Sequence, residues 1–208
     1  MPATPSRSRP GHDAWVVGDE SWDTVEFTSA AIFGTAPDES DETVLSTILF
    51  SDIVESTASL SRLGDQAWQR LLLEHNRRIR TELDRFRGRE MGTTGDGFLA
   101  LFDGAARAVR CARAMIRTVD ELGISIRVGL HTGEVAIVGG QARGLAVHAA
   151  SRVAALAGPG DVLVSATTRD LLDGSGLALV SRGEHELKGL VGARTIYAVD
   201  PGGPPAAT

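Results

Sequence analysis

The sequence predicts an α+β fold of the ferredoxin-like type, in which helices pack on one face of a mostly antiparallel sheet. Two short extended runs flank an Asp-Gly turn at residues 95–97, and this arrangement is typical of a β-hairpin. An apolar, β-branched run at 44–51 precedes one long helical pattern, and a second helical pattern follows the hairpin. The resulting order β-α-β-β-α-β, followed by α-β and closing strands, indicates this fold class.

The first elements are predicted from composition and spacing. Residues 44–51 form the first strand because β-branched and apolar side chains dominate it. Residues 57–86 form a helix, broken or bent near Gly64, because apolar positions recur along one face. Those positions are Ala67, Leu71, Leu72, His75, Ile79, Leu83 and Phe86. The hairpin strands are expected at 89–94 and 98–102.

The second half continues the same layout. Residues 104–122 form a helix with apolar positions at helical spacing, Ile124–Leu130 alternates as a strand, and 134–138 forms another strand. The helix at 144–157 is rich in small residues and ends at Gly158-Pro159-Gly160, a clear stop signal. The remaining elements are a strand at 162–165, a short helix at 166–172 and closing strands at 177–182 and 195–199.

The main domain is expected to span residues 44–200. Residues 1–43 are predicted to be a disordered arm, a short amphipathic piece and an acidic linker, because Pro, Ser and charged residues dominate both ends of this stretch. Residues 201–208 are predicted to be a disordered tail.

Composition excludes several classes of protein. The 208 residues carry a net charge of −6, so a nucleic-acid binder, which needs a basic face, is not expected. Cys111 is the only cysteine, which rules out an intramolecular disulfide and favours a reducing compartment; it is expected to be a core residue. The sequence contains no apolar run of membrane-spanning length and no signal-peptide pattern, so we expect no membrane association and a cytoplasmic location.

Two acidic residues form the candidate centre of chemistry. Asp52 ends the first strand, just before a helix start, and Asp96 sits at the hairpin tip between Gly95 and Gly97. In a ferredoxin-like fold the hairpin lies beside the first strand, so the two carboxylates can converge on a divalent cation and a nucleotide triphosphate. Taken singly, Asp52 also fits a plain helix cap and Asp96 a plain Asp-Gly turn.

Five motifs together resemble the class III nucleotidyl cyclases, in the correct order over about residues 44–199. They lie at 47–57, 91–102, 127–134, 144–152 and 182–189. Agreement in five places is more specific than any single motif. The resemblance is to actinobacterial members of the branch linked to hydrolase domains, and it implies the class III cyclase fold.

The resemblance also implies roles for individual residues. Asp52, Ile53 and Asp96 would hold two Mg²⁺ or Mn²⁺ ions, and backbone N–H groups of Ile53, Val54, Glu55 and Ser56 would cradle phosphate. Arg152 matches the arginine that stabilises the transition state. Lys188, the only lysine in the chain, matches a lysine that contacts phosphates. In this family one subunit supplies the carboxylates and its partner the arginine, so a homodimer is expected.

Three positions depart from the family pattern. His148 stands where an asparagine usually assists the transition state; it can donate a hydrogen bond or be a packing residue. Gly92 and Gln141 stand where a lysine and an aspartate usually read adenine. Gln141 can hydrogen-bond a base, whereas Gly92 has no side chain to do so, which leaves base recognition open.

The segment Gly11–Asp19 and the amphipathic piece after it resemble the end of an α/β-hydrolase, including its catalytic histidine at His12. Because the chain contains no nucleophile elbow, we interpret residues 11–34 as a remnant of a lost hydrolase domain.

Two functions of different kinds follow. The first is an adenylate cyclase that converts ATP to cyclic AMP and pyrophosphate; GTP is a lesser alternative substrate. The second is a non-catalytic module that binds nucleotide or dimerises, which Gly92 and Gln141 favour.

Overall fold

A computed structural model of the chain describes residues 42–93 and 95–200. The predicted arm, amphipathic piece, linker and tail, including the hydrolase-like segment with His12, lie outside the described residues, except for Glu42 and Thr43 of the predicted linker, which belong to the first strand.

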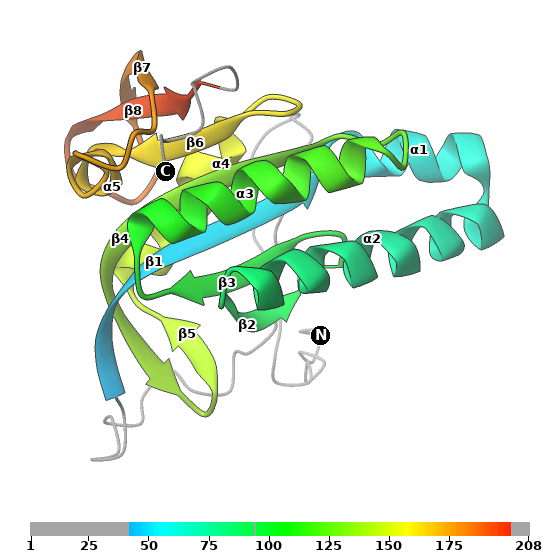
Figure 1. Cartoon of the computed structure of the whole chain (residues 1–208), viewed down its shortest axis with the longest axis horizontal. Helices are drawn as coiled ribbons and strands as arrows, with labels where there is room; N and C mark the ends of the chain where they lie inside the picture. Colours follow the sequence, from blue (N-terminus) through cyan, green and yellow to red (C-terminus); the bar gives the residue numbers. More distant parts are fainter. Residues whose placement is uncertain (1–41, 94, 201–208) are drawn as a thin grey trace, which may run out of the picture. The chain divides into compact units, whose positions relative to one another are not determined.

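The centre of the fold is an eight-stranded sheet built around β1 (Glu42–Ile53), which pairs antiparallel with β3 (Phe98–Phe102) and β4 (Ile126–Val138) (Figure 1). The strand order is β2-β3-β1-β4-β6-β8-β7, and β5 pairs with β4 beside this path. The other strands are β2 (Arg89–Thr93), β5 (Gln141–Arg143), β6 (Val162–Ser165), β7 (Leu179–Glu186) and β8 (Ala193–Val199). Of the pairings between described strands, only β4 with β6 is parallel, which confirms the predicted α+β class with a mostly antiparallel sheet.

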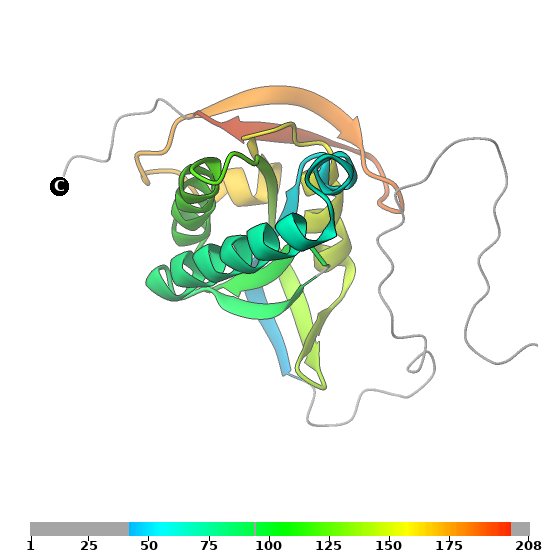
Figure 2. The same cartoon turned by 90° about the vertical axis from the view of Figure 1, so that its right-hand side faces the viewer.

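The helices cover both faces of the sheet. They are α1 (Ser56–Leu63), α2 (Asp65–Arg85), α3 (Ala105–Asp120), α4 (Leu145–Ala155) and α5 (Ala166–Asp170). The predicted break falls at Gly64, whose φ of +76° separates α1 from α2. Helices α2 and α3 lie side by side (Figure 2) and pack with Leu49 in one buried cluster. Helix α4 packs in another cluster with Ile48 and Phe50.

The expectation of helices on one face is therefore wrong. Ile48 and Phe50 alternate with Leu49 along β1, so they face the other side of the sheet, and all three are buried. A sheet with two apolar faces needs a cover on each, and α4 covers the second.

The expectation of separate strands at 124–130 and 134–138 is also wrong, because both belong to the 13-residue strand β4. Gly133 does not interrupt it; it pairs in register with Ser46 of β1. Both Gly129 and Gly133 face α4 closely, and a Cβ on Gly129 would lie 2.1 Å from the backbone N of Ala154. Because these glycines have no side chains, α4 can pack close to the backbone of β4.

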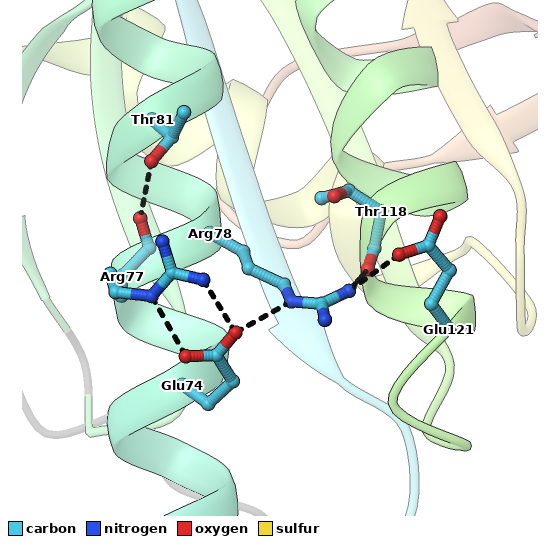
Figure 3. A network of polar contacts seen from close by, with 6 residues as sticks. All are labelled: Glu74, Arg77, Arg78, Thr81, Thr118 and Glu121. Atoms are coloured by element: carbon cyan, nitrogen blue, oxygen red, sulfur yellow. Dashed lines mark hydrogen bonds and ion pairs between the residues drawn. The ribbon is translucent and has the colours of Figure 1, made fainter.

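A polar network joins α2 to α3 at the surface (Figure 3). Hydrogen bonds from Arg77 and Arg78 lower the pKa of Glu74 to about 2. Arg78 Nη1 also donates to the Thr118 carbonyl at 2.6 Å and to Glu121 at 2.8 Å, so this one guanidinium ties the two helices together.

Candidate active site

Asp52 lies near the end of β1 and pairs in register with Arg127 of the neighbouring strand β4. Arg127 donates to one carboxylate oxygen of Asp52, with Nη2 at 2.7 Å and Nε at 3.2 Å. Both side chains are about one-third exposed. Asp52 is therefore held at the edge of the core, with one face toward solvent.

Asp96 lies at the tip of the β2–β3 hairpin, next to Gly95, whose φ of +86° makes the tight turn. Burial raises the pKa of Asp52, and the negative charge of Asp96 raises it further against the opposing effect of Arg127. Ser51 pairs in register with Phe98, so the strand end that carries Asp52 lies beside the hairpin tip that carries Asp96.

These two carboxylates suit a hard divalent cation. Mg²⁺ and Mn²⁺ prefer oxygen ligands, and a cation between Asp52 and Asp96 would offset the burial and the repulsion that raise the pKa of Asp52. Among the described residues no cluster of three or more His, Cys, Asp or Glu side chains forms a candidate metal site. The remaining ligands would therefore be backbone, water or substrate oxygens, as in nucleotide sites that keep Mg²⁺ partly hydrated.

The loop that follows Asp52 leads directly into α1. Glu55 takes a left-handed conformation, with φ of 55°, and α1 starts at Ser56 without a side-chain cap. The first N–H groups of α1 are thus not used by a capping side chain, in keeping with the predicted phosphate cradle. The Val54 amide differs, because it donates to the Ser125 carbonyl at 2.9 Å and is already occupied.

The other predicted residues lie on different elements. His148 and Arg152 are exposed one turn apart on α4, and Lys188 lies in the turn between β7 and β8. Gly92 of β2 and Gln141 of β5 are exposed on two strands that contact each other. Within residues 42–93 and 95–200, no hydrogen bond or ion pair joins Arg152 or His148 to the carboxylate pair.

Arg127 is a site residue that sequence reasoning missed. It stood at the start of the 127–134 motif, but nothing in the motif itself indicated a contact with Asp52. The signal lies in the register of β1 and β4, which places residues 75 positions apart directly opposite each other.

Comparison with known proteins identifies the family of the chain. Residues 38–200 match the family model described as the adenylate and guanylate cyclase catalytic domain. The chain therefore belongs to this family of nucleotidyl cyclase domains, which confirms the resemblance of its motifs.

The chain is also similar to individual proteins and solved structures. An uncharacterized protein of Mycobacterium tuberculosis is 40% identical over 99 residues, which make up 46% of this chain and 34% of the relative, so the chain spans about a third of that relative's length. The fold resembles the adenylyl cyclase CyaB from P. aeruginosa, with a TM-score of 0.73, 23% identity and coverage of 77% of this chain and 95% of that one. It also resembles the guanylate cyclase domain of RhGC from Catenaria anguillulae, solved in complex with GTP, with a TM-score of 0.70, 25% identity and coverage of 76% and 98%.

None of the helices in the described part of the chain has both the length and the apolar character needed to cross a membrane.

Proposed function

We propose that the chain is an adenylate cyclase that converts ATP to 3′,5′-cyclic AMP and pyrophosphate at sites shared across a homodimer. The observation that carries the proposal is the convergence of Asp52 and Asp96 at the end of β1, inside a cyclase family domain. His148 and Arg152 are exposed on α4, and among the described residues no hydrogen bond or ion pair joins them to the carboxylates, which supports a site completed by a second copy.

The carboxylates would hold two Mg²⁺ or Mn²⁺ ions together with the Ile53 carbonyl. When bound, such ions lower the pKa of the ribose 3′-hydroxyl and neutralise charge on the triphosphate. The chain's contribution is to fix both carboxylates at the strand end, where burial and mutual repulsion favour a cation.

The basic residues supply fixed positive charge for the phosphates. Arg152 of one subunit would stabilise the charge that develops on the α-phosphate as the 3′-hydroxyl attacks and pyrophosphate leaves. His148, one turn earlier, would donate a hydrogen bond to the same group. Lys188 would contact the terminal phosphates, and Arg127 would move from Asp52 to the triphosphate when cations replace it.

Base selection is the least specified part. Gly92 and Gln141 lie on contacting strands, which supports their proposed role as a base-reading pair, but only the side chain of Gln141 offers hydrogen-bonding groups. We therefore expect relaxed discrimination between ATP and GTP. This same feature favours the second candidate, a cyclase-homology module that binds nucleotide or dimerises without turnover.

The test is turnover of ATP and, separately, of GTP by the purified protein with Mn²⁺, following the cyclic product. We expect cyclic AMP from wild type and a loss of at least about a hundredfold in Asp52→Ala, because one metal carboxylate is removed. Asp84→Ala, an exposed change on α2, serves as the matched control and should retain activity. No product from either nucleotide, in a protein shown to be dimeric, would establish the module instead.

We further propose a cytoplasmic location and an origin of residues 11–34 in a hydrolase-linked ancestor. The second idea predicts that a protein of these 208 residues has no hydrolase activity, since they contain no nucleophile elbow that could act with His12. Hydrolysis of a simple ester by the pure protein, removed by His12→Ala, would refute it.

A further inference from the structure

A cavity of about 400 Å³ lies on the α4 side of the sheet, between β4, the first half of α4 and the β7–β8 hairpin. Its wall includes Ala149, which follows His148 and precedes Arg152 by three residues on α4. Its other wall includes Leu190, two residues after Lys188. The cavity thus adjoins the elements that carry the basic half of the proposed composite site.

Arg194 lines this cavity and has an unsatisfied donor. Its Nε atom is buried and has no hydrogen-bond partner among the described residues. A buried donor without a partner destabilises a charged group, so an oxyanion that pairs with the guanidinium where Arg194 lines the cavity would offset that cost.

The other titratable groups of the cavity do not cancel the charge of Arg194. His131 is 9% exposed, and its Nδ1 lies 2.7 Å from Ser165 Oγ. Burial and the charge of Arg194 lower the pKa of His131 to about 4, so the ring is neutral near pH 7. Glu134 lies at the wall, but alternation along β4 turns its side chain to the face opposite His131 and Gly133, and it is exposed.

The start of α4 adds hydrogen-bond donors. Leu145 and Ala146, in its first turn, line the cavity, and Gly144 at the N-cap offers no side-chain cap. Uncapped N–H groups and a guanidinium at one cavity both favour an oxyanion.

We propose that Arg194 binds a phosphate group of the nucleoside triphosphate, as a further cation of the half-site that contains Arg152 and Lys188. The inference rests on the proposed function for its substrate. Arg194 acts on binding rather than on the attacking or leaving atoms, so its loss should raise KM and the Kd for polyphosphate while kcat changes little.

The experiment compares wild type, Arg194→Gln and Arg194→Lys by titration with inorganic tripolyphosphate and by steady-state turnover of ATP with Mn²⁺. We expect Arg194→Gln to weaken tripolyphosphate binding and raise KM about tenfold, with kcat within about twofold, because one charged hydrogen bond is removed. Arg194→Lys should recover part of the loss, since it keeps the charge without the planar fork. Arg182→Gln, at an exposed arginine of the same hairpin, is the matched control and should bind as wild type.

Two results separate this inference from the proposed function. Tripolyphosphate binding by Arg194→Gln equal to that of wild type, in a variant with a wild-type thermal melt, would overturn the role of Arg194 even if cyclic AMP is made. If wild type makes no cyclic nucleotide but Arg194→Gln still loses polyphosphate binding, the cyclase proposal fails and the phosphate site stands.

Discussion

Arg127 donates two hydrogen bonds to a single carboxylate oxygen of Asp52, at 2.7 Å and 3.2 Å, across adjacent strands. The ion pair offsets two effects that raise the pKa of Asp52, its burial and the negative charge of Asp96. The guanidinium of Arg127 therefore neutralises part of the negative charge of Asp52, as a metal ion bound between the carboxylates would. A metal ion entering this site competes with Arg127 for Asp52.

This competition predicts opposite effects of Arg127→Met on two measurements. Without nucleotide, Mn²⁺ should bind roughly thirtyfold more tightly, because the removed guanidinium repels a divalent ion by ~2 kcal/mol at 4 Å in water. Turnover of ATP should instead fall, because the same arginine is proposed to contact the triphosphate. Calorimetric titration with Mn²⁺ and an assay of cyclic product measure the two effects.

Arg80→Met is the control for that experiment, because Arg80 is also an ion-paired arginine but lies on α2 and contacts Glu90. It should change neither measurement. Weaker binding of Mn²⁺ by Arg127→Met would contradict the competition.

The shared site predicts that two inactive variants restore each other. Asp52→Ala and Arg152→Ala damage different halves, so a heterodimer retains one intact cleft. Equal mixing gives about half heterodimers, each with one of two clefts working, and hence about a quarter of wild-type activity. Asp52→Ala mixed with Asp96→Ala is the control: both lesions lie in the same half, and no activity should return. Failure of the first mixture, with exchange of subunits demonstrated, would count against a cross-chain site.

The close packing of α4 on the sheet predicts that one methyl group added at Gly129 strongly lowers the stability of the protein. In Gly129→Ala the new Cβ would lie 2.1 Å from Ala154 N, a backbone atom that moves only if the helix moves. We expect a loss of about 3 kcal/mol in the free energy of unfolding, the upper end for overpacked cores. Turnover should fall as well, because Arg152 lies two residues from Ala154 on the same helix.

Denaturant titration of Gly129→Ala beside Gly92→Ala checks this expectation. A Cβ at Gly92 meets nothing within 4 Å, so that variant should lose less than about 0.5 kcal/mol. Equal stability of the two variants would show that α4 can shift freely on β4.

Local signals explain what the sequence could predict. Short stretches of chain determine the strand that carries Asp52 near its end, the break at Gly64 and the hairpin tip at Asp96, and the structure contains all three. Contacts between distant segments determine three other features: the packing of α4 on the second face of the sheet, the Arg127–Asp52 ion pair and the unsatisfied Nε of Arg194. One local feature did indicate the close packing of α4. Gly129 and Gly133 are four residues apart, which puts both on one face of a strand and leaves room for a helix there.

Buried His131 predicts how stability depends on pH. Its pKa is lowered to about 4 in the folded chain, by burial and then by the charge of Arg194, from 6.5 in an exposed histidine. Between these values the unfolded chain binds a proton that the folded chain does not, so stability falls as pH drops from about 6.5 to about 4. At ~1.4 kcal/mol for each pH unit, the loss from this residue approaches roughly 3 kcal/mol at the acid end.

The difference between wild type and His131→Gln isolates that contribution, because His75, whose pKa burial also lowers, is common to both proteins. Unfolding free energies measured from pH 7.5 to 4.5 should decline less steeply in the variant, whose amide cannot take up the proton. Above about pH 7 the two profiles should run parallel, because His131 is neutral in both the folded and the unfolded chain. Parallel profiles over the whole range would mean that His131 has the same pKa in the folded chain as in the unfolded chain. That result would contradict the burial of His131 beside Ser165.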